Sequence, residues 1–101
     1  MTRPSDILRA ARGLIAEPGH WAQGASRVGV AVCAAEAIDS SVGRDYDAID
    51  VAYRYLKRII GADPGVEGFI SSWNDAPERT HAEVLAAFDA AIALAEREEK
   101  P

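Results

Sequence analysis

The chain has 101 residues, 49% of them hydrophobic, and a formal net charge of −5 at pH 7. This length indicates one domain with a single core, and the hydrophobic fraction is that of a folded chain. The negative charge repels phosphate, and no apolar run approaches the roughly 20 residues that a membrane-spanning helix needs. We therefore expect neither nucleic acid nor a membrane as a partner.

The cysteine content and the first residues bear on the compartment. The single cysteine, Cys33, cannot form a disulfide within the chain, which is typical of proteins from a reducing compartment. Residues 1–6 carry an acidic side chain early and lack the apolar region of a secretory signal. The sequence thus predicts a cytoplasmic location.

The first thirty residues predict one helix followed by an irregular segment. Ser5 can cap a helix over residues 6–17, whose apolar side chains recur at helical spacing. Residues 18–29 contain three glycines and no hydrophobic period, so they predict a defined turn. Trp21 lies within this segment, and we expect it to pack at the edge of the core.

Two further helices are expected in the middle of the chain. Residues 30–40 predict a helix; the alternating valines of residues 27–32 resemble a strand, but one strand without a partner is not a sheet. Asp45 or Asp47 can cap the next helix, and Gly61 can end it.

The last third of the chain predicts a short helix and a long one. The short helix includes Phe69, Ile70 and Trp73, and Asn74 suits the left-handed residue that closes a helix. Thr80 and Glu83 have the spacing of a capping box, in which each side chain accepts a hydrogen bond from the other residue's backbone, at the start of the long helix.

These elements predict an all-α fold. We expect residues 1–101 to form a single compact domain of four to five short helices, with bundle-like or orthogonal packing and frayed ends at residues 1–4 and 97–101. The expected state is a monomer or a weak homodimer.

The residue types that commonly carry catalysis or metals are few. Cys33 could be a nucleophile with His20 or His81 as its base, but its alanine-rich surroundings favour a buried, inert thiol. These three residues lack the i, i+3 or i, i+4 spacing of metal ligands. The sequence predicts no metal site and no cofactor.

Several carboxylates could meet in a folded chain. Glu36, Asp50 and Asp89 could approach one another for acid–base work, although the sequence does not place them together. Asp89 borders an apolar helix face and requires a partner, which Arg79 or Tyr53 could provide. We expect a structural ion pair or hydrogen bond there rather than catalysis.

The most informative motif runs over residues 73–80, Trp-Asn-Asp-Ala-Pro-Glu-Arg-Thr. With Glu-Val-Leu at 83–85 and Asp-Ala-Ala-Ile at 89–92, it resembles a family of small helical proteins from actinobacteria and their phages. That family is known as a domain of unknown function. The resemblance implies a helical fold and a source, and it implies no activity.

The motif has a structural interpretation and a functional one. Structurally, Asn74 closes a helix, Asp75 makes a turn and Arg79 neutralises Asp75 or Asp89. Functionally, the motif forms a recognition patch, since Trp and Arg are enriched at interface hot spots. The candidate binding residues share two irregular segments, and they are Trp21, Gln23, Trp73, Asn74, Asp75 and Arg79.

Two hypotheses for the function follow. The first is a small, non-catalytic protein that binds another protein, with a phage or host regulatory role. The alternative is a small enzyme or ligand-binding domain with a pocket near Trp21, Cys33 and Trp73. A concave pocket would favour the alternative, and an exposed patch would favour the interaction protein.

Overall fold

A computed structural model describes residues 2–41, 45–61 and 69–100. The elements in chain order are α1 (Pro4–Leu14), a 3-10 helix η1 (Pro18–His20), β1 (Arg27–Val28), β2 (Ala31–Val32), α2 (Ala34–Ser40), α3 (Tyr46–Ile60), α4 (Phe69–Asp75) and α5 (His81–Glu99).

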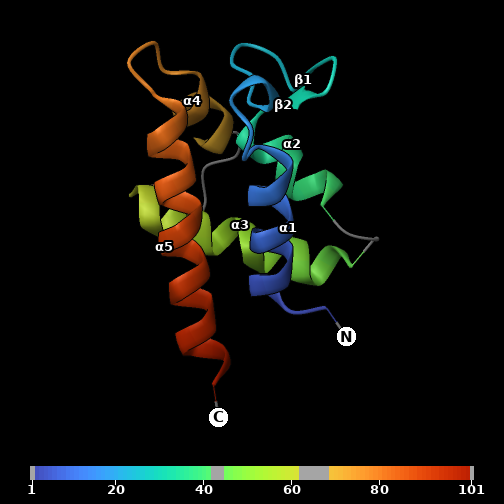
Figure 1. Ribbon diagram of the computed structural model, residues 1–101. Helices are drawn as coiled ribbons and strands as arrows, with labels where there is room; N and C mark the ends of the chain where they lie inside the picture. Colours follow the sequence, from blue (N-terminus) through green and yellow to red (C-terminus); the bar gives the residue numbers. More distant parts are fainter. Residues whose placement is uncertain (1, 42–44, 62–68, 101) are drawn as a thin grey trace.

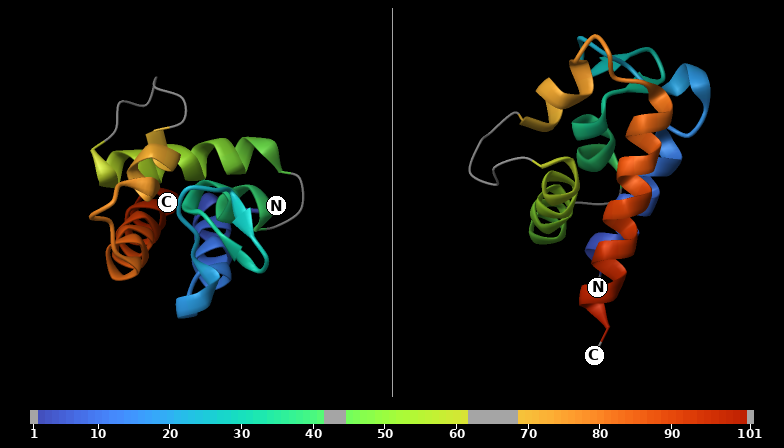
Figure 2. Two further views of the ribbon diagram at one scale, coloured as in Figure 1. Left: turned by 90° about the horizontal axis from the view of Figure 1, so that it is seen from above. Right: turned by 90° about the vertical axis from the view of Figure 1, so that its left-hand side faces the viewer.

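The helices pack as the predicted all-α domain. α1 and α5 lie side by side and run in opposite directions, and α3 crosses them (Figures 1 and 2). The buried side chains of these three helices form a single core with those of α2, and many of them are alanines, which allow the helices to approach closely. Among the described helices, none combines the length and the apolarity that crossing a bilayer requires.

The start of α1 differs from the prediction. Arg3 rather than Ser5 precedes the helix, because Pro4 fits the first helical position, where no backbone N–H is needed. Ser5 is buried and anchors the end of α5 instead: its hydroxyl donates to Glu99 Oε1 at 2.6 Å, and its backbone N–H donates to Oε2 at 3.0 Å. α5 continues to Glu99, through the residues that we expected to fray.

The prediction of a helix from residue 30 was wrong. β1 and β2 pair as an antiparallel hairpin, so the alternating valines find a strand partner within the same segment. Gly29, between the strands, has a φ of +61°, a left-handed conformation that costs a glycine little. Because of this turn, α2 begins only at Ala34, where the side chain of Cys33 accepts a hydrogen bond from the backbone of Glu36.

The ends of α3 confirm the sequence pattern. Asp45 Oδ1 accepts a hydrogen bond from the backbone N–H of Ala48, and Gly61 ends the helix with a φ of +77°. α4 contains Phe69, Ile70 and Trp73 as predicted. Its end differs, because no described residue other than glycine has a positive φ. Asn74 is therefore helical, and its side chain has another role.

The predicted capping box at the start of α5 is confirmed. Thr80 Oγ1 accepts from the backbone N–H of Glu83 at 3.1 Å, and Glu83 Oε1 accepts from the backbone N–H of Thr80 at 2.9 Å. The backbone hydrogen bond from Thr80 is the main reason why the pKa of Glu83 is lowered from its usual 4.5. The stabilisation by the charged carboxylate is therefore present above that value, and it is lost as the pH falls through the lowered pKa of the folded state.

Replacing the cap should destabilise the protein modestly. We expect Thr80→Ala to lower the free energy of unfolding by about 1 kcal/mol, because the N–H of Glu83 loses its acceptor. Chemical denaturation at pH 7 measures the difference, with the exposed α4 variant Ser72→Ala as control. Equal stability of the Thr80 variant and wild type would show that the cap is not needed.

Candidate functional site

The six candidate binding residues meet at one end of the molecule. The segment from η1 to β2 lies there beside the connection between α4 and α5 (Figure 1). Hydrogen bonds join residues about fifty positions apart in the chain, and nearly all of them involve the two predicted segments. The structure thus brings the predicted residues together into a hydrogen-bonded cluster, which we call the Asn74 network.

Asn74 is the centre of this network. It is 0% exposed, and its side chain has four partners. Its Oδ1 accepts from Trp21 Nε1 at 2.7 Å and from the backbone N–H of Ala34 at 3.0 Å. Its Nδ2 donates to the carbonyl of Ala22 and to Asp75 Oδ1, both at 2.9 Å. Asn74 therefore uses all the usual hydrogen-bonding capacity of a carboxamide, and it satisfies one of the unpaired N–H groups at the start of α2.

Two other predicted residues satisfy the carbonyl groups at the end of α4. Gln23 Nε2 donates to the carbonyls of Asn74 and Ala76 at 2.9 and 3.0 Å. Arg79 Nε donates to the carbonyl of Trp73 at 3.0 Å. The last carbonyls of a helix lack partners within that helix, so both side chains act as caps of α4.

Asp75 extends the network to the turn before β1. Its Oδ1 accepts from the backbone N–H of Gly24 at 2.9 Å. Gly24 has a φ of +78°, a conformation that other residues rarely adopt. The carboxylate of Asp75 therefore holds the chain at the point where it bends toward the hairpin.

The two tryptophans pack within the same cluster. Trp21 stacks on His81, with ring centroids 5.7 Å apart and planes inclined by 14°, and the Nε2–H of His81 donates to the carbonyl of Ile15. The Arg79 guanidinium lies 4.4 Å from the centre of the Trp73 ring. Sequence reasoning considered His81 only as a base or ligand and missed its contact with Trp21, which no local spacing signals.

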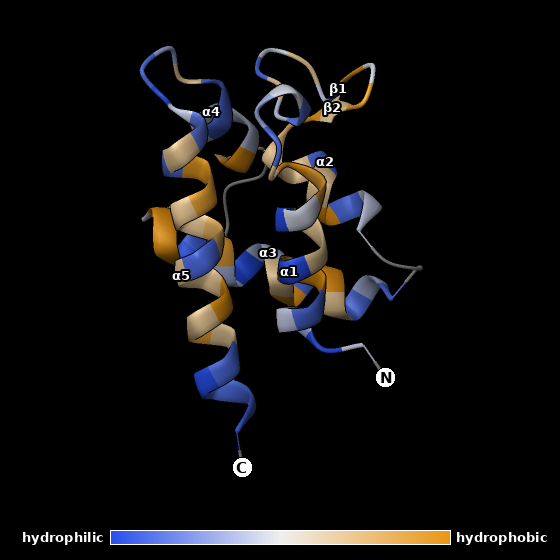
Figure 3. Ribbon diagram, in the orientation of Figure 1, coloured by the Kyte–Doolittle hydropathy of each residue, from blue (hydrophilic) through white to orange (hydrophobic). Residues whose placement is uncertain are grey.

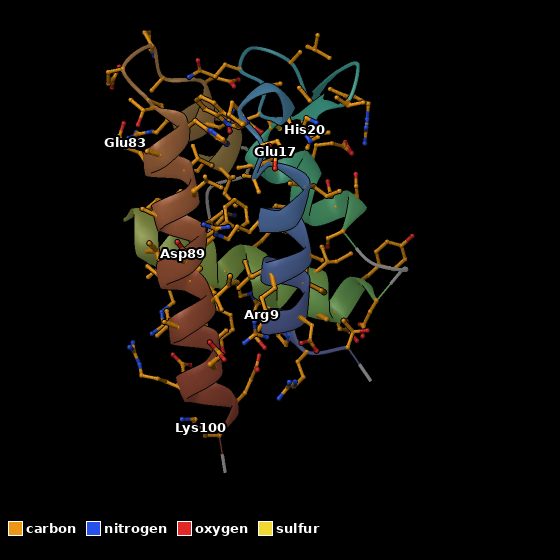
Figure 4. All side chains as sticks on the ribbon, in the orientation of Figure 1. Arg9, Glu17, His20, Glu83, Asp89 and Lys100 are labelled. Carbon is orange, nitrogen blue, oxygen red and sulfur yellow. The ribbon has the colours of Figure 1, made fainter. Side chains whose placement is uncertain are left out.

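The expected partners of Arg79 and Asp89 were wrong. Arg79 pairs with Glu83 at 3.2 Å, one turn along α5, rather than with Asp75 or Asp89. Asp89, on the middle of α5, pairs with Arg12 of α1 at 2.6 Å (Figure 4). The Arg12–Asp89 pair therefore joins α1 to α5, whereas the Arg79–Glu83 pair lies at the start of α5.

Tyr53 is not a partner of Asp89 either. Its hydroxyl lies 2.5 Å from Asp39 Oδ1 and 3.0 Å from the carbonyl of Ala35, where it joins α3 to α2. Burial is the main reason why the pKa of Tyr53 is raised, and Asp39 adds to it. The phenol therefore stays protonated at neutral pH and remains a hydrogen-bond donor.

The thiol is buried, as predicted. Cys33 is 3% exposed and belongs to the start of α2, where its sulfur lies 3.4 Å from the backbone nitrogen of Glu36. Among the described residues, no group of three or more His, Cys, Asp or Glu side chains is arranged to hold a metal ion.

The Asn74 network holds a hairpin in which two valines face solvent, while Ala31 and Val32 of β2 are buried. Val28 is 60% exposed and Val30 is 70% exposed, one on β1 and one in the turn. Figure 3 shows this hydrophobic hairpin at the end of the molecule that carries the network. The hairpin was missed by sequence reasoning, although its alternating valines were a signal.

These features define a small all-α domain in which a braced hairpin projects from one end. The chain belongs to DUF6197, a family of unknown function, whose model matches residues 1–94. No curated protein and no solved structure matches the chain significantly.

Proposed function

We propose that this protein is a non-catalytic module that binds another protein through the β1–β2 hairpin. The observation that carries the proposal is the exposure of Val28 and Val30 on a hairpin that the Asn74 network braces. A valine side chain exposed to water lacks the stabilisation that burial would provide, which is about 1.5–3 kcal/mol for a fully buried side chain. A partner that covers both side chains would recover much of it.

The hydrogen bonds that hold the chain on both sides of the hairpin support the same proposal. Gly24 and Ala34, on either side of the hairpin, are each held by a hydrogen bond to Asp75 or Asn74. A segment that is ordered before it binds loses less conformational entropy in the complex. The predicted motif residues thus contribute to binding by positioning the hairpin, and their own polar groups largely face one another.

The alternative function has less support. Trp21 and Trp73 are engaged with Asn74 and Arg79, and Cys33 is buried, so their contacts favour a packed cluster over a ligand pocket. The phage or host regulatory role in this proposal rests on the resemblance alone, which implies a source and no activity. The single buried cysteine supports a cytoplasmic location.

The hairpin can be tested by removing its apolar side chains. We expect the double variant Val28→Ser, Val30→Ser to keep wild-type stability, because both side chains are exposed. The same variant should bind the partner at least about tenfold more weakly, because the apolar surface that two valines would bury in the complex is lost. Captured proteins are identified by mass spectrometry, and their affinities for purified wild type and variant are then measured by calorimetry.

The matched control removes another exposed apolar side chain. Tyr46, at the start of α3, is 69% exposed, so Tyr46→Ser loses apolar surface away from the hairpin. A partner that binds wild type and Tyr46→Ser equally, and the valine variant weakly, supports the proposal. Equal binding of all three proteins contradicts it, and so does a valine-dependent dimer seen by analytical ultracentrifugation without another partner.

A further inference from the structure

A groove lies on one side of the molecule, between α2, α3 and α4. Its volume is about 490 Å³, within the range of sites that hold small molecules or single side chains. Figure 2 (right) shows the three helices around this side. Ser26, the residue before β1, belongs to its lining, so the groove begins where the proposed binding hairpin begins.

Three of the residues that line the groove are acidic. Glu36 and Asp39 come from α2, Asp50 comes from α3, and Lys57 is the cation of the lining. Lys57 lies seven residues beyond Asp50, which corresponds to about 10 Å along a helix. Asp50 and Lys57 are therefore about two helical turns apart on the wall that α3 contributes.

Two of these carboxylates, those of Glu36 and Asp39, belong to no ion pair among the described residues, like those of Glu17, Asp47 and Glu78 elsewhere on the surface. Glu36 accepts from Ser40, and Asp39 lies against the Tyr53 hydroxyl. A carboxylate has about four acceptor positions, so both groups can accept further hydrogen bonds.

Nearby cations reduce the negative charge only in part. Asp50 pairs with Arg54 at 2.8 Å, but both side chains are more than half exposed, so water weakens the pairing. Arg27 reaches Ser40 at 3.4 Å rather than either unpaired carboxylate.

The lining of the groove also includes apolar groups. Ala35 and Ile70 line it together with the half-buried Tyr53. Lysine and arginine side chains combine an aliphatic stem, which packs on such a surface, with a cationic head that seeks carboxylates. The groove therefore complements one of these side chains in both shape and charge.

We propose that this groove binds a lysine or arginine side chain from a segment of the partner protein. The inference rests on the proposed function, because the hairpin and the groove would contact the same partner. It adds the chemistry of that partner, a basic segment beside the apolar surface that covers Val28 and Val30. The head would lie near Glu36, Asp39 and Asp50.

The test uses a short acetylated peptide with two lysines and two arginines as the probe. Nuclear magnetic resonance titration of the full chain should show saturable shifts at the groove residues Ala35 and Ser71, and the same peptide with glutamine in place of its basic residues should show none. The double variant Glu36→Gln, Asp39→Asn keeps an acceptor for Ser40 and for Tyr53. It should bind about two- to thirtyfold more weakly, because two exposed or half-exposed charge pairs are lost.

Two controls separate specific from general attraction. Glu17→Gln removes one charge just before η1, at a residue that does not line the groove (Figure 4), and should leave the affinity unchanged. If the spectrum of the double variant shows that it is unfolded, Asp50→Asn on the exposed wall of the groove provides a second groove variant. The proposal is overturned if Glu17→Gln weakens peptide binding as much as the groove variants do. It is also overturned if a folded groove variant binds the peptide as tightly as wild type.

Further outcomes distinguish the partner. If spermidine binds as tightly as the peptide, the groove recognises a free amine rather than a segment of a protein, and the proposal is overturned. Shifts confined to the end of α5 would also overturn it, since Glu96, Glu98 and Glu99 lie there. The valine variants test the proposed function independently. If the groove variants bind the peptide as wild type does, while the valine variants bind the partner weakly, only this inference is rejected.

Discussion

Phe88→Ala should lower the free energy of unfolding by about 4 kcal/mol, because it removes a fully buried aromatic ring. Phe88 is the largest fully buried side chain among the described residues, and it belongs to the cluster of α1, α3 and α5. Alanines such as Ala11, Ala52 and Ala91 occupy the same cluster. These short side chains cannot extend into a cavity, so the expected loss is in the upper part of the range for such substitutions.

Urea denaturation, monitored by circular dichroism, measures this loss. Leu85→Ala, one turn earlier on α5, is the control, because Leu85 is only partly buried and packs against the edge of the cluster. Its loss should be clearly smaller. A Phe88 variant that loses no more than the Leu85 variant would mean that the alanine-rich core adapts by moving its helices together.

The helices could be predicted from the sequence because their signals are local. The apolar residues of α3 recur at helical spacing, and Asp45 and Gly61 mark its ends. The capping box of Thr80 and Glu83 uses residues three positions apart. Such signals need no knowledge of the rest of the chain, and they were sufficient for the all-α fold.

The hairpin could not be predicted by the same reasoning. The sequence shows alternating valines, but residues 27–32 taken as one strand would need a distant partner. A left-handed turn at Gly29 allows two residues on each side to pair with each other. Strands this short carry little periodicity, so the turn was the decisive feature.

The identity of the clustered residues was predictable, and their contacts were not. Trp21, Gln23, Asn74 and Arg79 stood out because polar and aromatic groups are concentrated in two irregular segments. The partners of Trp21 and Gln23 lie about fifty residues away, at the end of α4 and just after it. Sequence spacing therefore could not show that Asn74 is buried beside Trp21.

Asn74→Ala should lower the free energy of unfolding by about 3 kcal/mol or more. The substitution leaves Trp21 Nε1 and the N–H of Ala34 without an acceptor, and the carbonyl of Ala22 without a donor. Each buried polar group that loses its partner costs about 1–3 kcal/mol. Chemical denaturation measures the loss, and Ser72→Ala on the exposed face of α4 should change stability by less than about 0.5 kcal/mol.

Asn74→Asp tests which half of the carboxamide matters. It keeps an acceptor oxygen, but it loses the donor to Ala22 and buries a carboxyl beside Asp75. Burial and this neighbour raise the pKa of the new carboxyl above its unfolded value, so the destabilisation should shrink as the pH falls below that raised pKa. A loss that does not change with pH would place the new side chain in water.

The same substitutions connect the network to binding. If Asn74 holds the hairpin in place, Asn74→Ala should increase amide hydrogen exchange at β1 and β2 before the helices unfold. Partner affinity should then fall although Val28 and Val30 are unchanged, because an unbraced hairpin must be ordered on binding. If Asn74→Ala exchanges faster at β1 and β2 but binds the partner with wild-type affinity, the valines bind without support from the Asn74 network.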